Sequence, residues 1–390
     1  MICLIFAFVA QVEISRFVVN SHFELQAKSF AELRIEIQNP PTWLNDLAYF
    51  NGRYYNPFGI LPSLLLTPFY LLGVPLSQQT LPIVAFPITF LLIYKISRTL
   101  EVKRETDALW IAVFFTIGTI YLFLTLTNIS AYLVQVVSTP LILAALFEYF
   151  TKKRYFLIGC FLGAALLTRS VLIFPVVFFI VEILLNHGKD YNMAFKKILL
   201  LCIPIFACLL ISGIYNFLRF ESITDNGYDH NYSHAADLKI AREYGFFSVQ
   251  HIPGNLYLLL FKGPDPVKKD AVSFVLTSPF LKIDYWGLGI FFTSPVFFYL
   301  LLVSRKQKYV ISVCITILIM LFPILTFYAY GAWQYGYRHA FDLYPFLLIL
   351  LISVFKESFP VRAKLLIMYG IIFNLLFMYS IWNSYPLFVL

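Results

Sequence analysis

The stretch from Lys196 to Phe220, KKILLLCIPIFACLLISGIYNFLRF, carries no charged residue between Ile198 and Leu218. An apolar run of about 20 residues is long enough to cross the roughly 30 Å hydrocarbon core of a bilayer as a helix. Its apolar residues do not alternate with polar ones, as they would in a strand of a membrane barrel. Because lipid cannot satisfy an exposed backbone, the stretch predicts a membrane-spanning helix.

Similar apolar runs recur along the chain and set its class. Of the 390 residues, 60% are hydrophobic and only 13% are charged, whereas a soluble domain carries about a quarter charged residues. We predict an all-α, polytopic membrane protein with about 11 transmembrane helices in a single domain, residues 1–390. The complete spans are expected at 81–99, 108–127, 131–150, 155–168, 171–186, 197–217, 287–303, 309–329, 341–355 and 364–384.

Positive charge predicts the topology. Sixteen of the 29 Lys and Arg residues fall in five short connections, around residues 95–104, 152–154, 189–197, 305–308 and 356–364. The positive-inside rule places all five connections in the cytoplasm. The net charge of +8 is therefore interpreted as a topology signal and not as a sign of nucleic-acid binding.

Two long outer loops follow from this topology. The first is expected over 13–80, with a proline-punctuated helix near 59–76 lying in the outer interface, and the second over 218–286. The apolar segment 1–12 is too short to cross alone and is expected to be part of a first helix. No soluble domain is expected after the last span.

Charged residues in the first outer loop are candidates for chemistry. Glu13 and Arg16 follow the first apolar segment three residues apart, where an acid and a base are costly unless they pair or work. An ion pair that ends a helix is the alternative. Later in the loop, Asp46 and Arg53 are the charged members of an aromatic-rich run, which also fits an aromatic belt. The dipeptide Asn51-Gly52 predicts a turn.

Two arginines near the membrane predict an anionic partner. Arg169 lies between two apolar runs at the expected outer boundary, where snorkelling to lipid headgroups is the alternative. Arg338 lies in a late, aromatic-rich loop and can hold a phosphate by two parallel contacts. Its alternative is an ion pair with Asp342 at i, i+4.

Metal and nucleotide signals are weak. His230 and His234 are four residues apart, a spacing that permits a shared metal on a helix, although ordinary loop histidines fit equally. No cofactor is required by the sequence, and a divalent metal is left open. Asn128-Ile129-Ser130 fits the glycan-acceptor pattern, which is common by chance. The chain has no phosphate-binding P-loop and no dinucleotide fingerprint, so any energised donor is expected to arrive through the membrane.

Three stretches resemble one family: QVEISRF after the first helix, NDLAYFNGRYYNPFGILPSLLLTPFYLLG in the first outer loop, and GAWQYGYRHAFDLYPFLLILL late in the chain. Together with the tract GCFLGAALLTRS, they resemble the GT-C fold membrane glycosyltransferases of the family 39-like group, which includes protein O-mannosyltransferases and the aminoarabinose transferase. The resemblance extends over most of the chain. Where many relatives carry a lysine after the Tyr-Tyr pair, this chain has Asn56-Pro57-Phe58.

The resemblance implies transfer of a sugar from a polyprenyl-phosphate carrier to an acceptor lipid, glycan or protein outside the cytoplasm, with inversion at the sugar carbon. A bacterial cytoplasmic membrane is the implied location. Glu13 matches the position of the family's general base, and Asp46 matches a second acidic position. Arg338 matches an arginine that holds the carrier phosphate, and Arg169 is a looser match. Further candidates are Arg16 and Arg53 for the carrier phosphate, and Tyr54, Tyr55, Trp333 and Tyr337 for the substrate groove.

Two other functions remain open at this stage. One is a transporter or flippase of lipid-linked glycans, and the other is an inactive scaffold of the same fold. Transporters commonly show internal repeats and charges in mid-membrane. No repeat is found here, and the polar residues gather in the outer loops, which favours the enzyme.

Overall fold

Helices make up almost all of the regular structure of this chain. The computed structural model describes residues 21–230, 236–283, 286–331 and 334–384. Five helical segments among them are long and apolar enough to cross a membrane, which confirms the helical membrane fold expected from the sequence. These segments are Thr80–Thr99, Ser130–Phe150, Ser170–His187, Tyr191–Phe220 and Arg338–Phe355.

Contacts within the chain define two units. The first comprises Met1–Thr99 and Leu124–Lys239, and the second comprises Leu100–Phe123 and Ile240–Leu390. The elements of the first unit are α2 (His22–Ala31), β1 (Ala48–Phe50), β2 (Arg53–Tyr55), α3 (Leu61–Leu71), α4 (Thr80–Thr99), α7 (Ser130–Thr151), α8 (Tyr155–Leu166), the 3-10 helix η1 (Ser170–Ile173), α9 (Val176–His187), α10 (Tyr191–Phe220) and the 3-10 helix η2 (Tyr228–His230).

Helix α10 has the capped start and the exposed apolar side chains that are expected of a membrane span. Asp190 caps its first turn by accepting a hydrogen bond from the Met193 backbone N–H at 3.0 Å. The helix ends at Phe220, and the next residue, Glu221, adopts the left-handed conformation. Large apolar side chains with about half or more of their surface exposed recur every three or four residues along it, at Phe195, Leu199, Ile203, Phe206, Leu210, Ile214 and Phe217. An exposed apolar stripe of this length is stable only against lipid.

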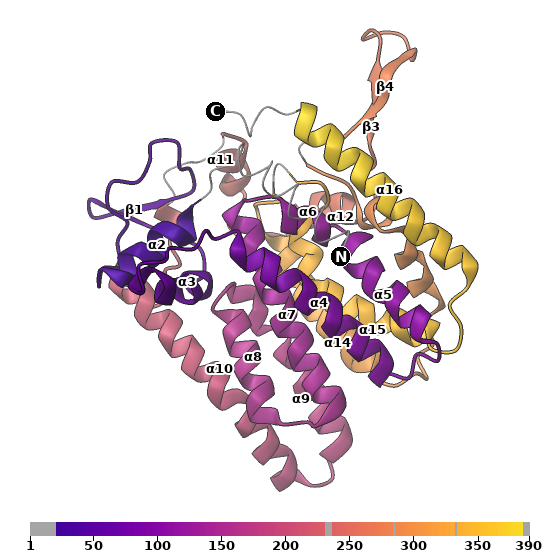
Figure 1. Ribbon diagram of the computed structural model, residues 1–390, viewed down its shortest axis with the longest axis horizontal. Coiled ribbons are helices and arrows are strands. Elements are labelled where there is room, and N and C mark those ends of the chain that lie inside the picture. Colours follow the sequence, from indigo (N-terminus) through magenta and orange to yellow (C-terminus); the bar gives the residue numbers. More distant parts are fainter. Residues whose placement is uncertain (1–20, 231–235, 284–285, 332–333, 385–390) are drawn as a thin grey trace. The chain divides into compact units, whose positions relative to one another are not determined.

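The opposite face of α10 packs against α8 through small residues. A Cβ atom at Gly159 would lie 2.2 Å from the Leu201 carbonyl oxygen, and one at Gly163 would lie 2.7 Å from Cys208 Sγ. The two glycines are four residues apart and therefore share one helix face. Such small-residue pairs let two membrane helices approach closely, and α8 and α10 lie side by side (Figure 1).

The second unit begins with α5 (Glu105–Ile117) and continues after the shared connections α6 (Tyr121–Leu126) and α11 (Ala236–Glu243). Its later elements are the 3-10 helix η3 (Val249–His251), α12 (Ile252–Leu260), β3 (Asp265–Lys268), β4 (Leu276–Lys282), α13 (Ile290–Thr293), the 3-10 helix η4 (Pro295–Leu302), α14 (Val310–Thr326), the 3-10 helix η5 (Arg338–Leu343), α15 (Tyr344–Phe355) and α16 (Val361–Ser384). Strands β3 and β4 form an antiparallel hairpin that projects from the helices of this unit (Figure 1).

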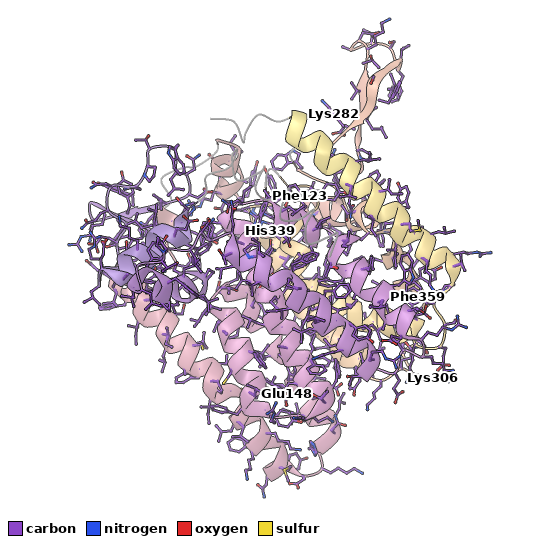
Figure 2. The ribbon with its side chains drawn as sticks, in the orientation of Figure 1. Phe123, Glu148, Lys282, Lys306, His339 and Phe359 are labelled. Carbon is purple, nitrogen blue, oxygen red and sulfur yellow. The ribbon has the colours of Figure 1, made fainter. Side chains whose placement is uncertain are left out.

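Two predicted cytoplasmic connections meet in the second unit. Lys356 pairs with Glu101, and Lys103 pairs with Glu357. A third ion pair joins Lys364 Nζ to Asp107 Oδ1 at 2.9 Å. Figure 2 shows Lys306 and Phe359 toward one end of this unit and Lys282 toward the other. This arrangement agrees with a topology in which the basic connections share one side, while the identity of that side stays a prediction.

Two predicted spans are broken rather than continuous. The helix expected over 108–127 stops at Ile117. Gly118 follows it, at a position where a Cβ would lie only 2.9 Å from the Phe114 carbonyl oxygen. The helix expected over 287–303 becomes the short α13 followed by η4, which begins at Pro295. Proline lacks the N–H that a continuing helix needs, so it starts a new helical segment here.

Candidate functional site at the outer loops

A buried polar network anchors the start of the first outer loop. His22 Nε2 donates to the Asn45 carbonyl oxygen at 2.7 Å, and Ser130 Oγ donates to His22 Nδ1 at 3.0 Å. The Gln78 side chain donates to Asn128 Oδ1 at 3.0 Å and to Ser130 Oγ at 3.3 Å. Each of these side chains is at most 8% exposed. The network therefore fixes α2, the loop before β1 and the start of α7 as one scaffold.

The network explains the protonation state of His22. Burial lowers the pKa of His22 to about 4, while the charge of nearby Asp46 and the carbonyl of Asn45 oppose that shift. A neutral ring with its proton on Nε2 satisfies both hydrogen bonds. The sequence analysis missed this network, and the signal that was available is a lone histidine close behind an apolar segment.

The same network bears on the glycan-acceptor pattern at Asn128. The Asn128 side chain is only 8% exposed, and its amide oxygen accepts a hydrogen bond from Gln78. A glycan acceptor has to present its amide on the surface. The pattern at Asn128-Ile129-Ser130 is therefore not a glycan acceptor, and it serves the scaffold instead.

The hairpin of the first outer loop carries three predicted site residues. Strands β1 and β2 pair antiparallel around Asn51-Gly52, whose positive φ angles confirm the predicted turn. Arg53 is exposed and Tyr54 is half-buried, whereas Tyr55 is only 4% exposed. The Tyr55 ring contacts Phe220 at 5.5 Å between centroids, so it packs inside its own unit.

Asp46 lies just before this hairpin as an exposed side chain. Its backbone adopts φ +63, a left-handed conformation that Asp tolerates better than most residues. The loop at Asp46 is close enough to His22 for the carboxylate to affect the histidine pKa. The structure thus holds the Asp46 backbone in place through Asn45 while leaving its carboxylate accessible.

A close backbone contact joins the first outer loop to Arg169. The Leu61 N–H donates to the Leu167 carbonyl oxygen at 3.1 Å. A Cβ atom at Gly59 would lie only 2.2 Å from the Thr168 carbonyl oxygen, so only glycine fits at this position. Half-buried Arg169 follows directly, between α8 and η1. We call residues 167–169 the arginine corner. The start of α3 and the arginine corner therefore form one local structure.

Arg219 at the end of α10 holds the same loop from another side. Its Nη1 donates to the Asn56 carbonyl oxygen at 2.5 Å, and its Nη2 donates to Asn216 Oδ1 at 2.7 Å. The guanidinium stacks over Tyr215, with its central carbon 3.9 Å from the centre of the ring, and Arg219 is only 4% exposed. Arg219 therefore acts as a structural clamp on Asn56, a role that the sequence analysis did not assign.

His230 is engaged in the packing of the central outer loop. Its Nε2 bonds Asp225 Oδ2 at 2.8 Å, and its ring stacks on Phe220 with centroids 5.3 Å apart. His234 lies outside the described residues, as do Glu13, Arg16 and Trp333. Within the described parts of the chain, no group of three His, Cys, Asp or Glu side chains is placed to hold a metal.

The late loop of the second unit is tightly fixed around Arg338. Gln334 donates to the carbonyl oxygens of Trp286 and Tyr330 at 2.9 and 3.0 Å, and its own side-chain oxygen accepts from the Arg338 backbone N–H at 3.1 Å. Leu288 exchanges backbone hydrogen bonds with this loop, accepting from the Tyr337 N–H at 3.1 Å. Gln334 was not singled out from the sequence.

Burial within this loop is uneven. Tyr337 is only 3% exposed, and burial raises its pKa while the charge of Arg338 opposes the shift. Arg338 itself is half-buried. The loop backbone is therefore tightly fixed, and it carries Arg338 as a half-buried residue.

The fold defines a polytopic helical membrane protein whose loops carry acidic and basic side chains on hydrogen-bonded backbones. No family model and no curated protein matches the sequence. Among solved structures, the chain is similar to the Archaeoglobus fulgidus oligosaccharyltransferase in its apo form, with 10% sequence identity and a TM-score of 0.44. The match covers 98% of this chain and 55% of that one, so this chain spans about half the length of the solved protein.

Proposed function

We propose that this protein is a glycosyltransferase that moves a sugar from a polyprenyl-phosphate carrier to an acceptor outside the cytoplasm. One observation carries the proposal. Two of the stretches that resemble the glycosyltransferases meet here, namely the first-loop run and the tract at residues 159–170, which contains Arg169. They are joined by the 3.1 Å hydrogen bond from the Leu61 N–H to the Leu167 carbonyl oxygen. Their contact at Gly59 is too close for any other residue, so this arrangement is built into the sequence.

The local chemistry suits a phosphate on a lipid chain. Arg169 offers a planar guanidinium that can bind a phosphate by two parallel hydrogen bonds. Helix α3 begins at this contact, and large apolar side chains that can pack along a prenyl chain are exposed on it and on the residue after it, namely Leu64, Leu65, Phe69, Leu71 and Leu72. A cation next to an exposed apolar helix is complementary to a carrier with a charged head and an apolar tail.

Arg338 lies on a loop of its own unit that Gln334 makes rigid, and the resemblance assigns it to the carrier phosphate. Arg16 and Arg53 are assigned to the carrier phosphate as well. Trp333 and the half-buried Tyr54 are assigned to the groove. A rigid donor costs little reorganisation energy when charge develops on the leaving phosphate.

The proposed reaction is a direct displacement. The acceptor hydroxyl oxygen forms a bond to the anomeric carbon while the bond from that carbon to the phosphate oxygen breaks. A carboxylate takes the hydroxyl proton, and polyprenyl phosphate leaves with its negative charge held by arginine. We assign Glu13 as this base and Asp46 as a second acidic group that orients the acceptor or the sugar. Attack opposite the leaving group inverts the anomeric carbon.

The proposed setting is the bacterial cytoplasmic membrane, with the outer loops facing away from the cytoplasm. We propose that transfer needs no metal, since arginine can stabilise the leaving phosphate by itself. A chelator added to the assay below is expected to leave the rate unchanged, and a rate restored only by a divalent cation would contradict this part.

The test uses the purified full-length chain in proteoliposomes with a radiolabelled polyprenyl-phosphate sugar and membrane acceptors. We expect transfer by the wild type, and a loss of about a hundredfold or more in Glu13→Gln, the size of a missing general base. Asp46→Asn and Arg169→Gln are expected to lower the rate as well. The control is Glu36→Gln, a half-buried acid of the same outer loop that has no assigned role.

Each outcome decides between the open functions. Carrier movement across the vesicle without any sugar transfer supports a flippase and overturns the proposal. A complete lack of both activities, with the protein folded, supports an inactive scaffold. Transfer that survives in Glu13→Gln removes Glu13 as the base and leaves Asp46 as the carboxylate to examine.

A further inference from the structure

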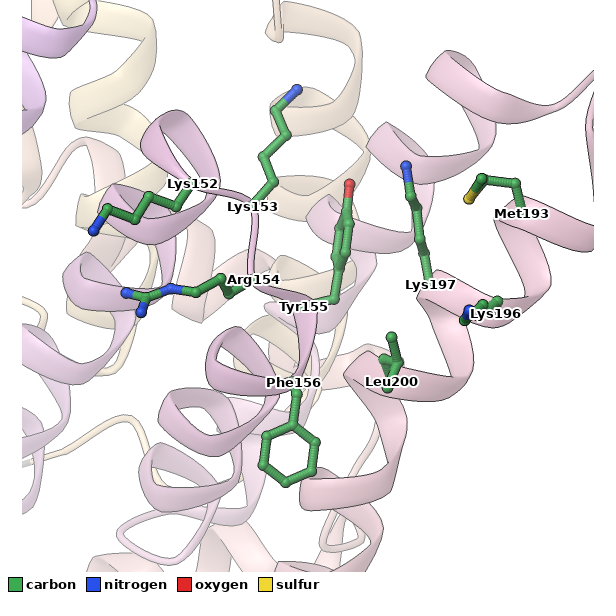
Figure 3. Close-up of a pocket in the computed structure, with 9 residues that line it drawn as sticks. All are labelled: Lys152, Lys153, Arg154, Tyr155, Phe156, Met193, Lys196, Lys197 and Leu200. Atoms are coloured by element: carbon green, nitrogen blue, oxygen red, sulfur yellow. The ribbon is translucent and has the colours of Figure 1, made fainter.

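A basic pocket lies at the end of the first unit that is expected to face the cytoplasm. Its volume is about 510 Å³, and it opens between the start of α8 and the first turns of α10. Lys152, Lys153 and Arg154 line it from the connection before α8, and Lys196 and Lys197 line it from α10 (Figure 3). Two basic connections that were interpreted only as topology signals therefore form one concave site.

Most of the positive charge in this pocket is uncompensated. Arg154 is neutralised, because its Nε and Nη2 donate to the two carboxylate oxygens of Glu148 at 2.8 Å each. Lys152, Lys153, Lys196 and Lys197 make no ion pair with any residue in the described parts of the chain. Four like charges around one pocket repel one another unless an anion binds between them.

The other acids near the pocket accept hydrogen bonds from uncharged groups. Asp190 caps the first turn of α10, and Glu182 accepts a hydrogen bond from Tyr149 at 2.8 Å. Among the described residues, neither forms an ion pair with a lysine that lines the pocket, and the five cations of the lining outnumber these two acids and Glu148. The positive charge of the pocket comes from two segments that the fold brings together, the connection before α8 and the start of α10.

Two of the lysines are held in place by uncharged neighbours. Lys197 Nζ donates to His187 Nε2 at 2.7 Å and lies 5.6 Å from the centre of the Tyr155 ring. Lys153 Nζ lies 5.3 Å from the centre of the Tyr149 ring. Figure 3 shows the polar ends of Lys153, Tyr155 and Lys197 pointing in the same direction. Three hydrogen-bond donors oriented together suit the oxygens of a phosphate.

Directly beside the charged pocket, the surface is apolar and exposed. Phe156 on α8 and Leu200 on α10 line the pocket and are 52% and 38% exposed. The exposed stripe of α10 continues from there through Leu199, Ile203 and Phe206. A ligand that satisfies both surfaces carries an anionic head and an apolar tail.

We propose that this pocket binds the phosphate headgroup of an anionic phospholipid from the cytoplasmic leaflet, with its acyl chains lying along the exposed stripe of α10. Basic pockets between membrane helices on the cytoplasmic side are suited to such headgroups. A soluble phosphate satisfies the lysines but leaves the apolar stripe unused, so the lipid is the favoured source of the anion. The site is separate from the outer loops and does not depend on the proposed glycosyl transfer.

The test is lipid binding to the purified full-length chain, measured by native mass spectrometry. The probes are dioleoylphosphatidylglycerol, dioleoylphosphatidylcholine and, as the soluble arm, glycerol 3-phosphate. The test variant is the double substitution Lys153→Gln and Lys197→Gln. Its matched control is Arg305→Gln with Lys306→Gln, which removes two exposed cations from another basic connection. A third variant, Lys153→Arg with Lys197→Arg, substitutes the same two positions but keeps their positive charge. Binding by this variant shows that the loss in the Gln variant comes from the lost charge.

We expect phosphatidylglycerol to bind the wild type, the control and the arginine variant, and to bind the Gln variant about tenfold to thirtyfold more weakly. Phosphatidylcholine is expected to bind all four proteins equally weakly. Equal loss of phosphatidylglycerol binding in the control and in the Gln variant would overturn the proposal, because only general surface charge would then be acting. Glycerol 3-phosphate that binds as tightly as the lipid would also overturn it, in favour of a soluble anion.

Discussion

The contact between Gly59 and the Thr168 carbonyl oxygen gives the sharpest prediction about the site. In Gly59→Ala, the new Cβ would lie 2.2 Å from that oxygen, whereas ordinary contact begins at 3.4 Å. The neighbour is backbone and not a flexible side chain, so the start of α3 and the arginine corner must separate by about 1.2 Å to reach that distance.

That separation has an energetic cost that can be estimated. It breaks the Leu61 to Leu167 hydrogen bond, which contributes about 1 kcal/mol net. Overpacking of a close contact adds about 1–3 kcal/mol. We therefore expect Gly59→Ala to lower the free energy of unfolding by about 2–4 kcal/mol.

The free energy is measured by reversible unfolding in mixed SDS micelles, followed by circular dichroism. The control is Gly254→Ala in α12, where a Cβ meets nothing within 4 Å. Alanine at an open helical position is expected to stabilise by about 0.5–1 kcal/mol. Sugar transfer is also expected to fall in Gly59→Ala, because Arg169 moves with the corner. Unfolding and transfer equal to those of the wild type would refute the reasoning.

Two further predictions concern the buried network of the first outer loop. Because the folded pKa of His22 is about 4 and its unfolded value is 6.5, the unfolded state binds the proton first as the pH falls. The contribution of neutral His22 to the free energy of unfolding is therefore expected to be fully present above about pH 6.5 and to fall by about 3 kcal/mol toward pH 4. Unfolding measured at several pH values tests this expectation. A His22→Gln protein with the same pH dependence would contradict this assignment. Gln78→Leu is expected to cost about 2–4 kcal/mol in unfolding free energy, because the Phe23 N–H and the Asn128 amide lose their partner in a buried place. The exposed Gln38→Leu is the matched control, expected within about 0.5 kcal/mol of the wild type, and equal effects of the two substitutions would argue against the network.

The sequence predicted the helices well because the bilayer imposes length and composition on each span. The run around α10 was expected over 197–217 and is part of a helix from Tyr191 to Phe220. The Asn51-Gly52 turn was also predicted correctly, since that dipeptide adopts positive φ angles easily. The breaks at Gly118 and Pro295 were missed, because hydropathy alone does not register a local bend in an apolar run.

The site was predicted in part. Arg169 was placed at the end of a span, and the structure places it between α8 and η1. The contact of Gly59 with Leu167 and Thr168, the two residues before Arg169, joins positions more than a hundred residues apart, and no local pattern encodes such a pairing. The His22 network was missed for the same reason, since its members come from four separate stretches of the chain. Glu13, Arg16 and Trp333 stay predictions.

The central claim is that Asp46 and Arg338 face one side of the membrane and the basic connections face the other. Single cysteines at Asp46, Arg338 and Lys153, in a protein whose five native cysteines are replaced, can be reacted with a membrane-impermeant thiol reagent in sealed right-side-out vesicles. The account predicts that Asp46→Cys and Arg338→Cys react in sealed vesicles, and that Lys153→Cys reacts only after the vesicles are opened. Labelling of Asp46→Cys and Arg338→Cys from opposite sides would contradict it.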